Sequence, residues 1–191
     1  MKNAILLHGT TNKAEYFDPE IPSLSQYNWF PWMQKQLLIN GIHTRCPQMP
    51  LAYAPEYRLW KTEFEMNMDE DVQILVGHSC GGGFLTRWLS ENTIGFETVI
   101  LVAPWLDPDR VKTTDFFDFE IGRNIPSRIK NFSLFISKDD DKDILESVEM
   151  IKSNIPSIKV YEFEDRGHFT IEESKRNDFP ELLEVILREA V

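Results

Sequence analysis

A serine, an aspartate and a histidine, in that order along the chain, are the residues best suited to chemistry. Ser79 stands in the pentapeptide Gly77-His78-Ser79-Cys80-Gly81, and Asp140 and His168 follow it. A serine hydroxyl is a poor nucleophile at neutral pH and needs a base to take its proton. The base needs an acid that holds its tautomer and stabilises the imidazolium. These residues predict attack by Ser79 on a carbonyl carbon, with His168 as the base.

The pentapeptide lies between two segments of different periodicity. The run 72–76 is short, apolar and rich in β-branched residues, which indicates a buried strand. The run 82–90 has apolar residues at helical spacing. A nucleophile elbow requires this order of strand, sharp turn and helix, with small residues two positions before and after the serine. The pentapeptide is therefore interpreted as such an elbow.

The acid is less well defined by the residues alone. The strand predicted at 132–137 ends in Lys138-Asp139-Asp140-Asp141-Lys142-Asp143, where four acids occupy five positions. Asp140 and Asp141 are both candidates, and Asp141 has the common spacing of three residues before an apolar one, Ile144. Most of such a charge run is expected to be a solvated loop.

His168 is the best candidate for the base, because it follows the last predicted strand and Gly167 allows the loop to turn back toward the elbow. The other histidines, His8, His43 and His78, are interpreted as packing or loop-orienting residues.

An oxyanion hole needs two backbone donors. We expect them to be the N–H of Cys80, directly after the nucleophile, and the N–H of Thr10, in the loop after the first strand. The Cys80 side chain should point away from the reacting centre and pack in the first helical turn.

Aromatic residues in a long loop could form a substrate pocket. Trp105 follows the fourth predicted strand, and Phe116 and Phe117 lie further along the segment 104–130. Loops of this length in a compact domain are usually functional or disordered. Together the three rings predict an apolar pocket at the sheet edge, with simple covering of the edge as the alternative.

The elements that must position these residues alternate along the chain. Strands are predicted at 4–7, 42–46, 72–76, 98–102, 132–137 and 158–163, and helices at 29–40, 55–66, 82–90, 143–154 and 180–188. Strands that alternate with helices indicate parallel βαβ units with helices on both faces of the sheet. Open sheets of this kind bind ligands at the carboxyl ends of their strands.

The composition limits the class of protein. The 191 residues predict one domain, 1–191, and the net charge of −11 disfavours nucleic acid and anionic membranes as partners. Three residues precede the first predicted strand and no apolar run reaches membrane-spanning length, so neither a signal peptide nor a membrane segment is expected. Cys46 and Cys80 fall in different elements and predict neither a disulfide nor a metal site. A cytoplasmic location and chemistry without a cofactor are the resulting expectations.

The chain resembles the small α/β-hydrolases grouped with retinoblastoma-binding protein 9 and its bacterial relatives. The likeness spans nearly the whole chain and rests on Leu6-Leu7-His8-Gly9, Trp29-Phe30-Pro31-Trp32, Met49-Pro50, the pentapeptide around Ser79, Ser137-Lys138-Asp139-Asp140 and Gly167-His168-Phe169. The resemblance implies a three-layer sandwich without a cap domain, built on a mostly or wholly parallel six-stranded sheet of order 2-1-3-4-5-6. It also implies a triad of Ser79, Asp140 and His168 and serine hydrolase activity on small esters.

The leading hypothesis is thus hydrolysis of a small carboxylic ester, or of a thioester or amide, through an acyl-enzyme on Ser79. The competing hypothesis is a protein-binding module on the same fold with weak or vestigial catalysis, since a fold alone never fixes function.

Overall fold

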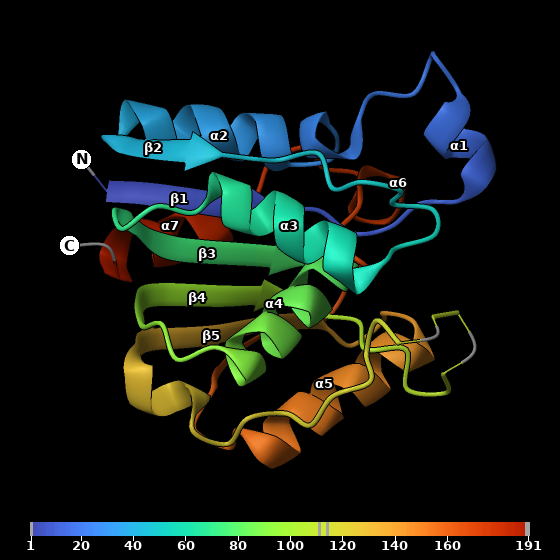
Figure 1. Ribbon diagram of the computed structural model, residues 1–191. Coiled ribbons are helices and arrows are strands. Elements are labelled where there is room, and N and C mark those ends of the chain that lie inside the picture. Colours follow the sequence, from blue (N-terminus) through green and yellow to red (C-terminus); the bar gives the residue numbers. More distant parts are fainter. Residues whose placement is uncertain (1, 111, 114, 190–191) are drawn as a thin grey trace.

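The computed structural model describes residues 2–110, 112–113 and 115–189. Within them, six strands form one wholly parallel sheet in the order β2-β1-β3-β4-β5-β6 (Figure 1). The strands are β1 Lys2–Leu7, β2 Ile42–Arg45, β3 Val72–His78, β4 Phe96–Val102, β5 Ile129–Ser137 and β6 Lys159–Phe163. The predicted fold class and strand order are confirmed.

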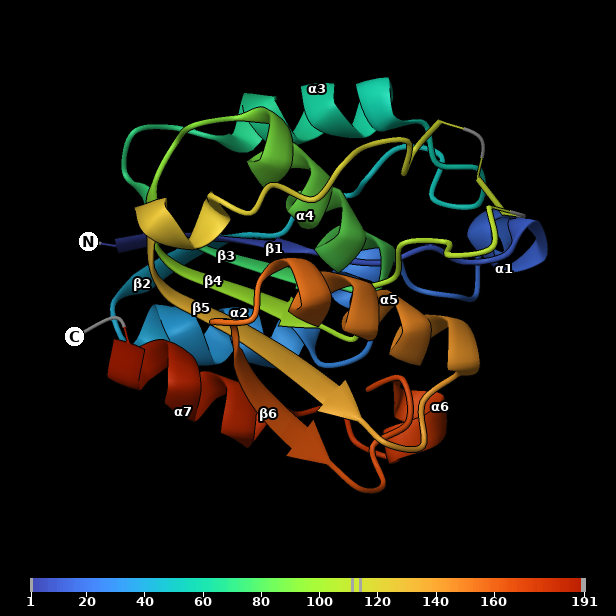
Figure 2. The ribbon, with the colours of Figure 1, turned by 90° about the horizontal axis from the view of Figure 1, so that it is seen from below.

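Helices cover both faces of the sheet and complete a three-layer sandwich (Figure 2). One face carries α3 Tyr57–Asn67, α4 Cys80–Glu91 and α5 Lys142–Asn154, and the other carries α2 Phe30–Ile39 and α7 Pro180–Glu189. Four short elements were not predicted: α1 Lys13–Phe17, α6 Ile171–Ser174, and 3₁₀ turns at Leu24–Gln26 and Ile125–Arg128. No separate cap domain is present among the described residues, and none of their helices is long and apolar enough to cross a membrane.

The inner strands are almost entirely buried, because each has helices above and below it. In β3 and β4 nearly every residue is buried, whereas β6, at the edge of the sheet, is largely half-buried or exposed. Near-continuous apolar runs are what a parallel sheet covered on both faces requires. The buried strands therefore form a rigid base for the loops that follow them.

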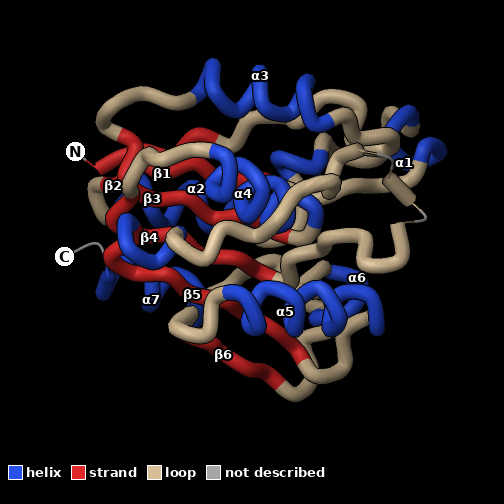
Figure 3. Tube along the Cα trace, turned by 60° about the horizontal axis from the view of Figure 1, so that its bottom comes forward, coloured by secondary structure: helices blue, strands red, loops and turns tan. Residues whose placement is uncertain are grey.

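All strands point the same way, so the loops at their carboxyl ends gather at one edge of the sheet (Figure 3). The pairing of β3 with its neighbours sets Gly77 beside Leu7 on β1 and His78 beside Val102 on β4. The segments that follow β1, β3, β5 and β6 therefore converge there. These four segments carry the residues that the sequence singled out.

Candidate active site

Ser79 occupies a strained turn between β3 and α4. Its backbone angles are φ 56° and ψ −125°, which few residues other than glycine adopt. The turn is held by three backbone hydrogen bonds: Ser79 N–H donates to Val102 O at 2.9 Å, and Ser79 O accepts from Gly83 N at 3.1 Å and Trp105 N at 3.0 Å. The structure thus has the sharp strand–turn–helix geometry that was predicted from the pentapeptide.

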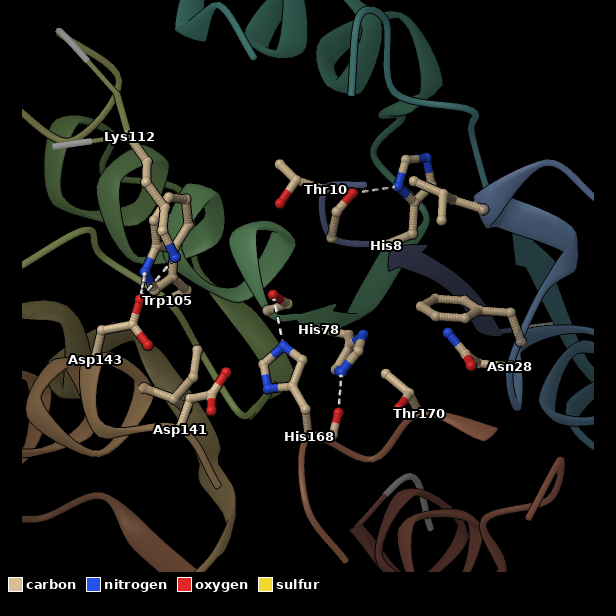
Figure 4. A pocket seen from close by; sticks show the side chains of 15 residues that line it. His8, Thr10, Asn28, His78, Trp105, Lys112, Asp141, Asp143, His168 and Thr170 are labelled. Atoms are coloured by element: carbon tan, nitrogen blue, oxygen red, sulfur yellow. Dashed lines mark hydrogen bonds and ion pairs between the residues drawn. The ribbon is translucent and has the colours of Figure 1, made fainter. Parts of the chain in front are cut away.

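Two hydrogen-bonded contacts link Ser79, His168 and Asp140. His168 Nε2 lies 2.8 Å from Ser79 Oγ, and His168 Nδ1 lies 3.1 Å from each carboxylate oxygen of Asp140 (Figure 4). A carboxylate accepts, so Nδ1 carries the proton and Nε2 is left to accept from the serine hydroxyl. This is the arrangement in which an imidazole can remove the serine proton.

The three consecutive aspartates have three different surroundings. The side chain of Asp140 is 1% exposed and faces His168, and its Oδ1 also accepts the N–H of Asp141 at 2.7 Å. Asp139 accepts from the Ser137 hydroxyl at 2.5 Å and from Gly167 N–H at 2.9 Å, so it holds the turn before His168. Asp141 is exposed and lines the cavity beside His168. Of the two candidates for the acid, the structure brings Asp140 to the histidine.

The loop after β1 passes directly over the serine. A side chain at Gly9 would put its Cβ 2.7 Å from Ser79 Cβ and 3.0 Å from Ser79 Oγ, so only glycine allows this approach. Among the described residues, neither Thr10 N–H nor Cys80 N–H has a hydrogen-bond acceptor in the protein. Neither N–H is therefore committed to another group in the described part of the protein, and their role as oxyanion donors stays a prediction. The Cys80 side chain is fully buried, as expected for a packing residue.

The backbone of His168 is held on both sides by groups whose part the sequence did not reveal. His78 Nε2–H donates to the His168 carbonyl at 2.8 Å, and Glu173 accepts the His168 N–H. His78 was expected to pack or orient a loop, and the structure shows that the loop is the one carrying His168. Nothing in the sequence indicated the role of Glu173, because it is one of many glutamates and lies in a polar segment.

His8 and His78 are buried neutral imidazoles. Met49 N–H donates to His8 Nε2 at 2.9 Å, so the His8 proton is on Nδ1, which donates to Gly9 O at 2.7 Å. Burial lowers the pKa of His8 from 6.5 to about 4. Burial, with a smaller effect of His168, lowers the pKa of His78 from 6.5 to about 3. Both side chains therefore stay uncharged near neutral pH.

We expect this burial to make the protein less stable in mild acid. Below pH 6.5 the unfolded chain binds protons on these histidines that the folded chain does not bind, so the free energy of unfolding falls as the pH falls. The slope should be about 1.4 kcal/mol per pH unit for each histidine. Urea unfolding at pH 7, 6 and 5 measures it. His78→Phe should remove one histidine's share of the slope, and His43→Gln, at an exposed position, should not. An unchanged slope in His78→Phe would contradict the expectation.

A cavity of about 240 Å³ opens beside Ser79 and His168. Its charged wall is formed by Trp105, Lys112, Asp141 and Asp143 (Figure 4). The Trp105 indole N–H donates to Asp143 at 3.0 Å, and the Lys112 ammonium pairs with Asp143 at 3.1 Å. The opposite wall is mixed, with residues such as Leu24, Asn28, Phe30 and Thr170.

Of the three aromatic residues predicted to form the pocket, Trp105 lines this cavity. Phe116 and Phe117 do not: they are 0% and 1% exposed and belong to the core. Phe116 packs edge-on against Trp60 at 5.2 Å between ring centroids, and Phe117 packs edge-on against Trp105 at 5.5 Å. The expectation for these two rings was wrong, because aromatic neighbours on α3 and α4 draw the loop inward. Among the described residues, no cluster of three acidic, histidine or cysteine side chains is placed to hold a metal ion.

Comparison with known proteins gives consistent matches. The sequence model of the family described as serine hydrolase matches residues 23–187. The serine hydrolase RBBP9 of Rattus norvegicus is 25% identical over 174 residues, covering 85% of this chain and 87% of that protein. YdeN of Bacillus subtilis (strain 168) is 26% identical over 167 residues, covering 78% of this chain and 82% of YdeN. The crystal structure of the ydeN gene product from B. subtilis superposes with a TM-score of 0.79 at 21% identity, covering 100% of this chain and 99% of that one.

Proposed function

Because this chain belongs to the serine hydrolase family, we propose that it cleaves small carboxylic esters through an acyl-enzyme on Ser79. The observation that carries the proposal is the continuous path from Ser79 Oγ through His168 to the buried Asp140, with contacts of 2.8 and 3.1 Å. Ser79 is the nucleophile, His168 the general base and then the general acid, and Asp140 the group that orients His168.

In the first half of the reaction Ser79 Oγ attacks the ester carbonyl carbon while His168 Nε2 takes the hydroxyl proton. The carbonyl oxygen becomes an oxyanion, which the N–H groups of Thr10 and Cys80 bind. The tetrahedral intermediate collapses, and His168 gives its proton to the departing alkoxide. Water then attacks the carbonyl carbon of the acyl-enzyme while His168 takes a proton from the water. The second tetrahedral intermediate collapses, His168 returns the proton to Ser79 Oγ, and the carboxylic acid is released.

The dimensions of the cavity at Ser79 favour a small group next to the bond that is cleaved. A cavity of about 240 Å³ is below the usual size for drug-like ligands, and its walls are largely polar. Esters are the first choice because an alkoxide leaves more readily than the anion of an amine, so an amide can be cleaved only if its nitrogen is first protonated. Thioesters, and amides whose nitrogen His168 can protonate, fit the same chemistry.

The proposal is tested by labelling the purified protein with a fluorophosphonate. We expect one equivalent of phosphonate per chain, located by peptide mass spectrometry on Ser79, and loss of labelling when p-nitrophenyl acetate competes. Brief mixing with that ester should also add one acetyl group to the intact mass. Failure of the folded protein to label would reject the acyl-transfer site and favour the binding-module hypothesis.

A further inference from the structure

Two further cavities adjoin the mixed wall of the cavity at Ser79. A second cavity, of about 290 Å³, shares Thr10, Leu24, Asn28 and Thr170 with the first. A third, of about 240 Å³, shares Thr11, Glu15, Ile21 and Leu24 with the second. The shared residues place the three cavities next to one another between Ser79 and α1.

We propose that the second and third cavities form a side groove that binds the distal part of an elongated, polar and non-anionic substrate whose reacting bond lies at Ser79. The inference rests on the proposed acyl-transfer function and adds the class of substrate. The side groove comprises Thr10, Thr11, Glu15, Tyr16, Ile21, Pro22, Ser23, Leu24, Tyr27, Asn28, Gln48, Thr170 and Glu172.

The charge of the side groove decides which ends of a substrate it accepts. None of the described residues that line it is basic, whereas Glu15 and Glu172 are acidic. Glu172 accepts the Tyr27 hydroxyl at 2.5 Å, Glu15 accepts the Thr11 hydroxyl, and neither carboxylate has a basic partner within 4.0 Å among the described residues. The Lys175 ammonium donates to the backbone carbonyl of Glu172 at 2.5 Å, so one positive charge lies beside the side groove without pairing with either carboxylate. The two carboxylates still disfavour a substrate carboxylate or phosphate, while ammonium or amide N–H groups would find acceptors.

The walls of the side groove are fixed before any substrate binds. Asn28 Oδ1 accepts the N–H of Ile171 at 2.9 Å, which ties the segment before α2 to α6. On the other side, Thr11 N–H donates to Ala52 O at 3.3 Å and Asn12 caps α1 by accepting from Glu15 N–H at 2.9 Å. Asn28 and Thr170 lie on the same side of the cavity in Figure 4, where the side groove begins. A preformed groove keeps the ordering cost of binding low.

The proposal is tested with two substrate series, one extended on the acyl side and one on the alcohol side. Each contains an acetate-sized ester and three long esters of equal length that end in trimethylammonium, in its neutral tert-butyl isostere or in a carboxylate. In one series, we expect the kcat/KM of the wild type to be about tenfold higher for the long cationic ester than for the long carboxylate ester. Glu15 and Glu172 would each attract the cationic end and repel the anionic one. Glu172→Gln should reduce this preference by about threefold.

A plug variant, Ile21→Trp, tests the length of the groove, since Ile21 lines the second and third cavities but not the first. The ratio of kcat/KM for long over short esters should fall by about tenfold or more, because a blocked groove loses the distal contacts. Met150→Trp and Glu149→Gln, on α5 and outside the groove, should leave both preferences unchanged. An unchanged ratio in Ile21→Trp, or equal turnover of cationic and carboxylate esters, would overturn the proposal.

A binding measurement separates this inference from the proposed function. Calorimetry with the ether analogue of the long cationic ester, which has no carbonyl for Ser79 to attack, should detect binding to wild type and weaker binding to Ile21→Trp, whether or not the ester is turned over. Normal labelling of Ser79 together with equal affinity of the two proteins for the ether would reject the side groove alone.

Discussion

Ser79→Ala is expected to lower kcat for p-nitrophenyl acetate by about 10⁴-fold or more and to abolish labelling by a fluorophosphonate. The hydroxyl is the atom that forms the acyl-enzyme, and Nε2 of His168, 2.8 Å away, has no other nucleophile to activate in the described site. Turnover is measured by release of p-nitrophenol, with active sites counted by the label in wild type.

The Ser79→Ala protein should remain folded, because alanine at this position removes one oxygen and adds no atom near the loop at Gly9. Its melting temperature and far-UV circular dichroism serve as the controls. Retention of more than about 1% of wild-type turnover by a pure, folded Ser79→Ala protein would exclude Ser79 as the nucleophile.

Asp140→Asn is expected to have the next largest effect, a fall in kcat of about 10⁴-fold, while Asp141→Asn should change kcat by less than about threefold. Asp140 accepts from His168 Nδ1 at 3.1 Å through both oxygens, and an asparagine would present an N–H there and favour the opposite tautomer. With the proton on Nε2, His168 cannot accept from Ser79. The measurement is again kcat for p-nitrophenyl acetate, over a range of pH.

Asp139→Asn is the matched control for Asp140→Asn. An asparagine at position 139 keeps an oxygen that can accept Gly167 N–H, now 2.9 Å from Asp139, so the turn before His168 should persist. We expect a loss well below that of Asp140→Asn. An equal fall in kcat for Asp140→Asn and Asp141→Asn would contradict the proposal that Asp140, the buried aspartate, is the acid that orients His168.

The fold could be predicted from the sequence because its main elements are long and strongly patterned. Five helices and six strands were predicted near their observed positions, with errors of a few residues at the ends, as for β5, which starts at Ile129 instead of residue 132. By contrast α1 and α6 have five and four residues, too few to show a helical repeat. Their formation depends on local caps, such as Asn12 for α1, and on the loops around them.

The candidate site could be predicted only where a residue has a fixed place in a motif. Ser79 was predicted because it directly follows a strand in a recognisable turn, and His168 because it follows a glycine in the loop after the last strand. The choice between Asp140 and Asp141 depends on which side chain is buried, and adjacent aspartates in a charge run carry no sign of that. The pocket prediction for Phe116 and Phe117 was wrong for a related reason. The sequence does not distinguish an aromatic loop residue that lines a cavity from one that packs in the core.

The two described ends of the chain have a practical consequence for handling the protein. Lys2 begins β1, and Glu189 ends α7 with its carbonyl accepting from Asn131 near the start of β5 at 3.2 Å. Both ends therefore lie at the amino edge of the sheet, opposite the loops that carry Ser79 and His168 (Figure 1). A purification tag, a fluorescent fusion partner or a solid support joined next to Lys2 or Glu189 would therefore start on the side of the sheet opposite the cavity at Ser79.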